Sequence, residues 1–194
     1  MAESGATPRR RLAPQDWATA ALDAIAEGGL AAVAVEPLAI RLGTTKGSFY
    51  WHFANREALL EAALARWEEL HTIEVNAEVE AAVADPARRL RLLIERVTAL
   101  ADGDRAGVVL HAAADHPAVA RVLARVARRR VDFLAGLFSQ LGLPAVRARQ
   151  RALLAYSAYL GHAQLAQSLP GLMPEGKRAR QEYLDHIVGV LTAP

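Results

Sequence analysis

The sequence predicts an all-α protein of about nine helices, and three observations support this prediction. The only periodicity of apolar residues that recurs along the chain is the helical one. Trp17, Ala21 and Ile25, for example, fall on one face of a helix. No stretch alternates between apolar and polar residues as the strands of a hairpin do. Glycine and proline residues, such as Gly43 and Pro117, divide the chain into segments of helical length.

The predicted helices differ in length along the chain. We expect them at about 15–28, 35–42 and 46–53, then from Arg56 to as far as Ala84, with the last two at about 145–168 and 176–192. The fourth would extend about 40 Å at about 1.5 Å per residue, so it can connect a small N-terminal unit to a larger helical body. We therefore expect two domains, residues 1–55 and residues 56–194.

Composition excludes several classes of protein. The chain has 194 residues, of which 53% are hydrophobic, and this is enough to bury a substantial core. It has no cysteine, which excludes disulfides, thiolate metal sites and a cysteine nucleophile. Because the sequence has no signal-peptide pattern and no apolar run of about 18 residues, we expect a soluble cytoplasmic protein with no membrane partner.

Charge is distributed unevenly although the net charge is only +2. Residues 57–85 hold eight acids and one base, whereas residues 40–56 hold three bases and no acid. Residues 87–151 hold thirteen arginines and five acids. Since those arginines are spread over several helices, we expect them to be solvated or to pair with the acidic segment.

The stretch GTTKGSFYWHF, residues 43–53, fits neither a core helix nor an ordinary solvated helix. Phe49 and Phe53 are four residues apart, so we expect both rings in the core of a three-helix unit. The other side chains would face outward. Lysine and serine can reach base edges in a DNA groove, and glycine lets the backbone approach the duplex. Tyrosine, histidine and hydroxyl groups suit phosphate oxygens.

The residues on either side of this stretch complete a helix-turn-helix pattern. Pro37 lies in the first turn of a short helix, where its missing N–H costs nothing, and Gly43 permits the backbone of a tight corner. Arg56 begins the next helix, where its charge opposes the helix macrodipole. A phosphate beside Arg56 would offset the unfavourable interaction between the arginine charge and the macrodipole.

The segment LAIRLGTTKGSFYWHFANREALL, Leu38 to Leu60, resembles the tetracycline-repressor (TetR) family of bacterial transcriptional regulators. The resemblance implies a helix-turn-helix DNA-binding domain in residues 1–55, with a basic N-terminal tail, and an all-helical effector-binding and dimerisation domain in residues 56–194. It implies base or near-base contacts from Lys46, Gly47, Ser48 and Trp51, and contacts with the DNA backbone from Thr45, Tyr50, His52 and Arg56. This chain departs from the family pattern at Ala34, often a capping threonine, and at Thr44, usually valine.

The resemblance also implies partners. We expect a homodimer that binds a palindromic double-stranded operator, because one recognition helix reads few bases. The last two helices, which are apolar on more than one face, would form the dimer. The expected function is that of a ligand-responsive regulator, a repressor released by a small-molecule effector, with no cofactor. Candidate pocket residues are Trp67, His71, His111, Phe133, Tyr156 and Tyr159.

Several alternatives stay open from the sequence alone. Arg9-Arg10-Arg11 is either a basic tail or an arm that contacts DNA. Residues like the candidate pocket residues more often belong to a core or a dimer interface, and Thr45 can be a helix cap alone. The histidines lack metal-site spacing, and no catalytic motif occurs. The alternative functions are an all-α enzyme or a partner-binding helical module in which the helix-turn-helix is only structural.

Overall fold

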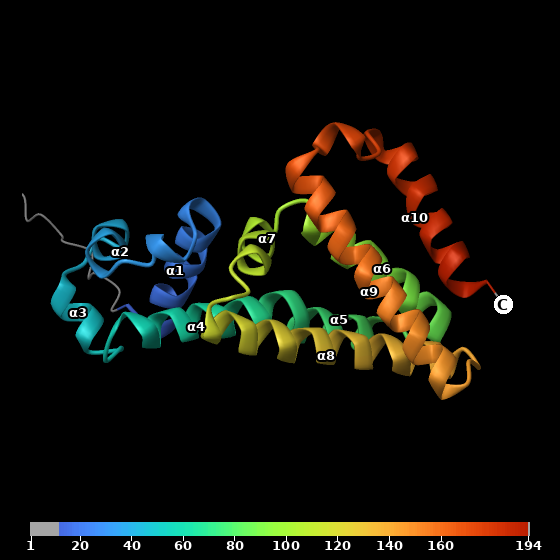
Figure 1. The fold of residues 1–194 in the computed structure, drawn as a ribbon, viewed down its shortest axis with the longest axis horizontal. Coiled ribbons are helices and arrows are strands. Elements are labelled where there is room, and N and C mark those ends of the chain that lie inside the picture. Colours follow the sequence, from blue (N-terminus) through green and yellow to red (C-terminus); the bar gives the residue numbers. More distant parts are fainter. Residues whose placement is uncertain (1–11, 194) are drawn as a thin grey trace, which may run out of the picture.

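A computed structural model describes residues 12–193, and within that range helix is the only regular structure (Figure 1). The α-helices are α1 (Pro14–Gly28), α2 (Val35–Arg41), α3 (Lys46–Tyr50), α4 (Arg56–Glu68), α5 (Glu74–Ala82), α6 (Pro86–Ala101), α7 (Arg105–Ala112), α8 (Pro117–Gln140), α9 (Ala145–Ser168) and α10 (Gly176–Thr192). A π-helical segment, Glu69–Ile73, joins α4 to α5, and short 3-10 turns occur at Leu30–Ala32 and Pro170–Leu172. Counting α4 to α5 as one helix, the described residues form nine helices, and the predicted all-α fold is confirmed.

The N-terminal unit is built around aromatic rings. Phe49 and Trp17 are fully buried, and their rings meet edge to face with centroids 5.5 Å apart. Phe53 stacks on Phe49 at 5.6 Å. Leu38 of α2 and Ile25 of α1 close the same core. The two phenylalanines therefore lie inside, as the sequence predicts.

The corner between α2 and α3 depends on glycine. Gly43 has φ +62°, a conformation that costs a residue with a side chain about 1–2 kcal/mol. It lets the N–H of Thr44 donate to the carbonyl of Ala39 at 2.9 Å and so close the end of α2. The expected helix 46–53 is shorter than predicted, because α3 ends at Tyr50. Beyond it, the N–H groups of both His52 and Phe53 donate to the carbonyl of Phe49, which makes a tight turn.

The predicted long helix from Arg56 is present but contains a π-helical segment. It runs from Arg56 to Ala82, two residues short of the expected limit, because Val83 is extended. Asn55 caps its first turn, with the N–H of Ala58 donating to Oδ1 of Asn55 at 2.9 Å. In the π-helical segment, Glu69–Ile73, the wider hydrogen-bonding pattern changes the register of the backbone carbonyls.

The C-terminal body consists of α5, α6, α8, α9 and α10. In Figure 1, α8 and α9 form a long helical pair, with α6 beside them and α10 at the end that carries the C-terminus. A second hydrophobic cluster fills this body; Phe138, Leu90 and Ala152 are among its fully buried residues. Within residues 12–193, no helix is both long and apolar enough to cross a membrane.

A single hydrophobic cluster joins the N-terminal helices to the helices that follow. It includes Trp17 of α1, Leu64 of α4, Leu110 of α7 and Val126 of α8. Helices α1 and α7 also pack against each other, so a shift of α7 or α4 would move the N-terminal unit.

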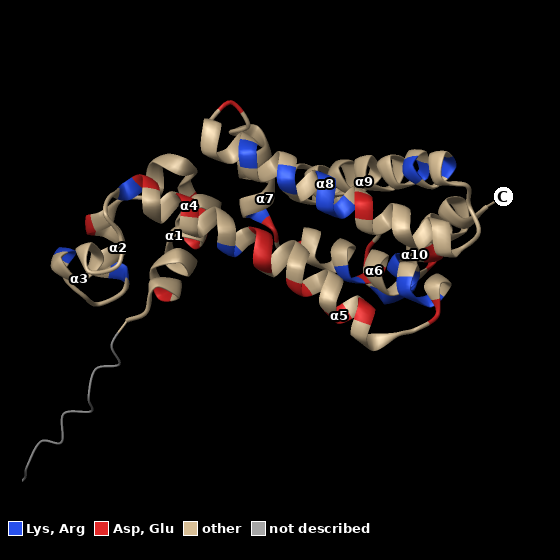
Figure 2. Ribbon diagram, turned by 90° about the horizontal axis from the view of Figure 1, so that it is seen from below, with Lys and Arg blue, Asp and Glu red and all other residues tan. Residues whose placement is uncertain are grey.

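Arginines of α8 pair with the acids of α4, as the charge distribution predicts. Arg121 lies 3.3 Å from Glu61, and the guanidinium of Arg125 donates to the buried carboxylate of Glu68. Arg129 also lies 3.8 Å from Glu68. Figure 2 shows acids along α4 and α5 and bases along α8. The arginines of α8 therefore contribute to packing between helices.

Candidate nucleic-acid interface and small-molecule cavity

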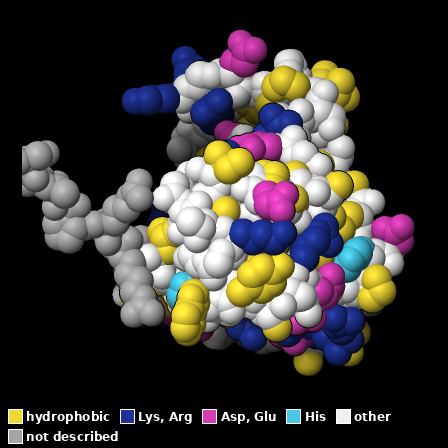
Figure 3. Space-filling view, turned by 90° about the vertical axis from the view of Figure 1, so that its left-hand side faces the viewer, with side chains coloured by type: hydrophobic (Ala, Val, Ile, Leu, Met, Phe, Trp, Pro, Cys, Tyr) yellow, Lys and Arg dark blue, Asp and Glu magenta, His cyan; other side chains and the backbone are white. Residues whose placement is uncertain are grey.

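Helix α3 lies at one end of the molecule, far from α9 and α10 (Figure 1). Figure 3 views this end directly, and basic, hydrophobic and histidine side chains reach the surface there. The C-terminal body does not cover α3, so the surface predicted to contact DNA is open to solvent.

The side chains predicted to contact DNA are grouped on this open surface. Trp51 is 83% exposed and Tyr50 is 57% exposed, which is unusual for such large side chains. The exposed members of the predicted set are Thr45, Lys46, Gly47, Tyr50, Trp51 and Arg56, and the half-buried members are Ser48 and His52. Trp51 and His52 follow α3 in the turn that leads to Phe53. The eight residues thus belong to α3, its two ends and the start of α4, and their contact with DNA stays a prediction.

Lys46 and Thr45 both have polar groups that a DNA partner could engage. Nζ of Lys46 lies 2.8 Å from Oε1 of Glu36, and this hydrogen bond raises the pKa of Lys46 and lowers that of Glu36. Because both side chains are largely exposed, such a pair contributes little and can exchange for a phosphate or a base edge. Thr45 occupies the N-cap position of α3, but its side chain makes no capping hydrogen bond.

Gly47 lies at the second position of α3 with free space above it. A Cβ atom placed there would meet Oγ1 of Thr45 at 3.6 Å, which is ordinary van der Waals contact. Its φ is also compatible with a side chain, unlike that of Gly43. Nothing among the described residues therefore requires a glycine at position 47.

Arg56 has partners that the sequence does not predict. Its Nε donates to the carbonyl of Val33 at 2.7 Å, and its Nη2 donates to the carbonyl of Leu30. The guanidinium thus satisfies carbonyls of the turn between α1 and α2, which offsets the unfavourable position at the start of α4 without any phosphate. The position of Arg56 at the start of α4 therefore does not require a phosphate, and the contact of the exposed Arg56 with DNA stays a prediction. The basic segment Arg9-Arg10-Arg11 lies outside the described residues.

A cavity of about 280 Å³ lies inside the C-terminal body. It is lined by residues of α6, α8, α9 and α10 and of the π-helical segment and α5. The lining is mostly apolar, with Leu93, Val97, Leu134 and Ile187 among its members. Its volume is close to the lower end of the range for small-molecule sites, and its mostly apolar lining is typical of them.

The predicted pocket residues divide between this cavity and a smaller one beside it. His71, Phe133, Tyr156 and Tyr159 line the large cavity. Trp67 and His111 line the second cavity, of about 160 Å³. Trp67 itself is only 1% exposed, and its ring meets that of His111 edge to face. Binding by these residues stays a prediction.

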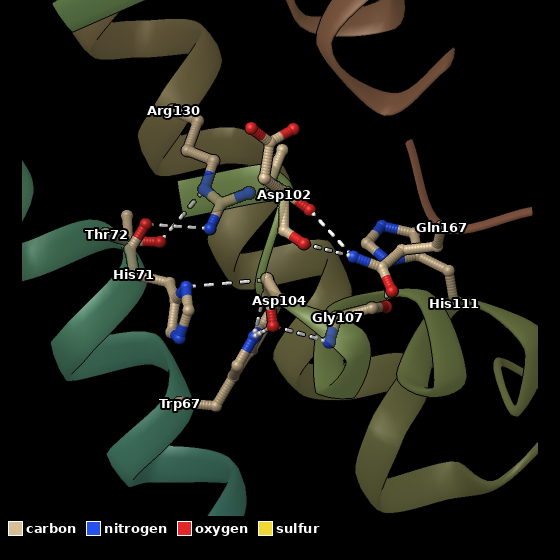
Figure 4. Close-up of polar contacts among 10 residues, drawn as sticks. Trp67, His71, Thr72, Asp102, Asp104, Gly107, His111, Arg130 and Gln167 are labelled. Atoms are coloured by element: carbon tan, nitrogen blue, oxygen red, sulfur yellow. Dashed lines mark hydrogen bonds and ion pairs between the residues drawn. The ribbon is translucent and has the colours of Figure 1, made fainter. Parts of the chain in front are cut away.

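Arg130 of α8 lies at the border of the two cavities and is not among the pocket residues predicted from the sequence. Its Nε donates to Oγ1 of Thr72 at 2.9 Å and its Nη2 donates to the carbonyl of His71 at 2.8 Å (Figure 4). Both acceptors lie in the π-helical segment. The guanidinium also lies 5.4 Å from the ring centroids of Trp67 and Tyr159, within cation–π distance.

Asp104 forms a buried polar centre between α4 and α7. Its carboxylate accepts from the N–H of Gly107 at 2.8 Å and from Nε1 of Trp67 at 3.3 Å. Oδ2 of Asp104 also lies 3.4 Å from Nδ1 of His71 (Figure 4). The sequence offers one signal for this residue, since an aspartate just before a helix is a typical N-cap, but that signal does not reveal the contacts with Trp67 and His71.

Burial controls the protonation of the cavity lining. Desolvation lowers the pKa of His71 below 6.5, with a further lowering by Arg130 and an opposing effect of Asp104. It likewise lowers the pKa of His162, and it raises that of Tyr156 and Tyr159 against the opposing charge of Arg130. At neutral pH these four side chains are therefore uncharged.

The described part of the chain contains no group of three or more His, Cys, Asp or Glu residues arranged to hold a metal ion. The histidines instead pair with aromatic rings. His71 stacks on Trp67 and His162 stacks on Tyr183.

The short α2, the corner at Gly43 and the exposed α3 define this protein as a helix-turn-helix protein with a helical C-terminal body. Residues 19–63 match the model of the bacterial regulatory proteins of the tetR family. The resemblance inferred from Leu38 to Leu60 is thus confirmed for this N-terminal segment.

Part of this chain also matches a curated protein. A segment of 66 residues is 42% identical to the tetracycline repressor protein class A from transposon 1721 of Escherichia coli. That match covers 34% of this chain and 31% of the repressor. The chain thus matches about a third of the length of that relative.

Solved structures share the fold over nearly the whole chain. A transcriptional regulator from Rhodococcus sp. Rha1 has a TM-score of 0.72 at 23% identity, covering 93% of this chain and 94% of its own. AibR, solved in complex with isovaleryl coenzyme A and operator DNA, has a TM-score of 0.65 at 23% identity, covering 93% and 98%. SmeT, the repressor of the Stenotrophomonas maltophilia multidrug efflux pump SmeDEF, has a TM-score of 0.66 at 20% identity, covering 93% and 90%.

Proposed function

We propose that this protein is a dimeric, ligand-responsive transcriptional regulator that binds a palindromic operator and is released from it by a small molecule. The observation that carries the proposal is the surface of α3, where Lys46, Tyr50 and Trp51 face solvent at the end of the molecule. An amphipathic tryptophan and tyrosine are costly to leave in water, and a DNA groove would cover them.

Dimerisation is supported by an apolar face on α9 that no other described helix covers. Leu153 and Leu154 are 57% and 59% exposed, and Val146 and Leu165 are also exposed. Leu154 and Val190 of α10 together border the large cavity. Two copies that pair through α9 and α10 would form a four-helix arrangement around a two-fold axis. Two α3 helices could then enter successive major grooves, about 34–36 Å apart.

Control by a ligand is supported by the position of the cavity. The π-helical segment, Glu69–Ile73, borders the large cavity and continues into α4, which packs against α1 and shares its hydrophobic cluster. A ligand that prefers one position of α4 would change operator affinity by its preference between the two states, typically about 1–3 kcal/mol. The solved complexes of AibR with isovaleryl coenzyme A and operator DNA, and of SmeT with triclosan, support this part of the proposal by analogy of fold.

Selection of bound duplexes from a random pool tests the proposal. We expect enrichment of a palindrome and binding that weakens steeply with salt. Recovery of no preferred sequence by a dimeric protein would favour a partner-binding module, and failure to bind any duplex would favour the all-α enzyme, in which the helix-turn-helix is only structural. Neither alternative is supported by a specific feature of the described residues.

A further inference from the structure

The charge of the large cavity identifies the kind of molecule it can take. Among the described residues that line it there is no aspartate, glutamate or lysine, and Arg130 is the single arginine. His71 and His162 are neutral at pH 7 because burial lowers their pKa values. The cavity therefore presents one permanent positive charge, and the rest of its lining is apolar apart from a few hydroxyl, imidazole and amide groups.

Arg130 is held so that its charge stays at the cavity wall. Thr72 and the carbonyl of His71 accept hydrogen bonds from Nε and Nη2, while the rings of Trp67 and Tyr159 lie against the guanidinium. These partners are neutral, and in the described residues no carboxylate forms an ion pair with Arg130. This distinguishes it from Arg125 and Arg129, which pair with Glu68.

Arg130 is half-buried and has no ion-pair partner among the described residues, so an incoming anion would find an unpaired positive charge at the cavity wall. The guanidinium has further N–H donors beyond the two used by Thr72 and His71, and its planar fork suits a carboxylate. Burial raises the pKa of Tyr156 and Tyr159, and the nearby charge of Arg130 only opposes that rise, so both hydroxyl groups stay protonated and can donate to the same anion.

We propose that the large cavity binds a mainly apolar small molecule that carries one anionic group, and that Arg130 receives this group. This inference rests on the proposed function, because it names the class of effector for the same cavity. The apolar part of the ligand would lie among Leu93, Val97, Leu134 and Ile187, and the acid group would lie at the α8 side of the cavity. A neutral molecule of the same shape would bind more weakly, and an organic cation would be excluded.

A matched pair of fluorescent probes tests the inference on the full-length protein without DNA. The first is 1-anilinonaphthalene-8-sulfonate, and the second is N-phenyl-1-naphthylamine, which has the same rings but no sulfonate. Affinities of both are measured by fluorescence titration for wild type, Arg130→Gln and Arg130→Lys. We expect Arg130→Gln to lower the affinity for the anionic probe at least tenfold and to change the affinity for the neutral probe less than threefold. Arg130→Lys, which keeps the positive charge, should retain part of the preference for the anionic probe over the neutral one.

Two further variants control the result. Arg128→Gln removes an exposed arginine of the same helix and should change the affinity for neither probe. Asn76→Asp, in the cavity lining, adds a negative charge without changing a partner of Arg130 and should also weaken only the anionic probe. This second variant keeps the test decisive if Arg130→Gln disturbs folding, which circular dichroism would reveal.

The inference is overturned if both probes weaken equally in Arg130→Gln and Asn76→Asp, or if neither variant alters the binding of the anionic probe. Because no duplex is present, either failure leaves the proposed DNA-binding function unaffected. Conversely, a protein that fails to bind any duplex could still show the expected preference for the anion, so the two proposals fail separately.

Discussion

Replacing Gly47 by alanine separates a requirement of the fold from a requirement of the DNA complex. In the free protein the added Cβ would meet only Oγ1 of Thr45, at 3.6 Å, so no atom has to move. Alanine is favoured over glycine by up to about 1 kcal/mol inside a helix, and by less in a first turn such as this one. We therefore expect Gly47→Ala to leave the free energy of unfolding unchanged or to raise it by a few tenths of a kcal/mol.

The same substitution should weaken DNA binding. If the backbone of α3 approaches the duplex at Gly47, the added methyl group is forced against a sugar or a base, and overpacking typically costs about 1–3 kcal/mol. That range corresponds to a loss of affinity of about 5-fold to 150-fold. A clash with a sugar would weaken all operator sequences similarly, whereas a clash with a base edge would make the loss depend on the sequence.

Urea unfolding and fluorescence anisotropy with a selected operator measure the two effects on the same preparation. Gly136→Ala is the matched control, since Gly136 is an exposed glycine inside α8 with free space at its Cβ position and lies far from α3. It should raise stability and leave DNA affinity unchanged. Unchanged operator affinity in Gly47→Ala would refute the close approach of α3, and a large loss of stability would refute the reading of free space at Gly47.

Other predictions concern specificity, assembly and pH. Lys46→Ala should change which operator sequence is preferred, whereas Tyr50→Phe should weaken all sequences about equally, as titration against operator mutants at fixed salt would show; identical profiles for Lys46→Ala and wild type would refute its reading role. Leu153→Glu should shift dimers to monomers in sedimentation velocity with unchanged helix content, and a persistent dimer would exclude this face of α9. Burial lowers the pKa of His71 in the folded protein, so as pH falls below about 6.5 the His71 side chain is protonated in the unfolded chain before it is protonated in the folded protein. The free energy of unfolding therefore decreases as pH falls below about 6.5. His71→Gln should make this decrease shallower in urea unfolding, and an equally steep decrease would contradict the assignment.

The sequence predicts the fold well where local signals agree. Gly43 marks the corner between α2 and α3, and the spacing of Phe49 and Phe53 identifies the buried side of α3, so the exposed side follows by exclusion. The π-helical segment, Glu69–Ile73, could not be predicted, because its residues have ordinary helical spacing and its altered hydrogen bonds depend on tertiary partners such as Arg130.

The cavity is less accessible to sequence reasoning, because its walls come from helices far apart in the chain. Aromatic and histidine residues at helical spacing indicated six candidates, yet Trp67 and His111 belong to a second cavity with Asp104. Arg130 is one of thirteen arginines between residues 87 and 151, and nothing in its local sequence distinguishes it from Arg129. Only the packing of α8 against the π-helical segment separates their roles.

Trp51 provides the most direct test that the open surface of α3 contacts DNA. The chain has three tryptophans, and Trp17 and Trp67 are buried at 0% and 1% exposure, so acrylamide quenching of the free protein reports mainly Trp51. Trp51→Phe should remove the readily quenched fraction and identify it. We predict that a selected operator duplex protects this fraction from acrylamide, a neutral quencher that the DNA charge does not repel. A protein that is bound to its operator while Trp51 stays as accessible as in the free state would contradict the account.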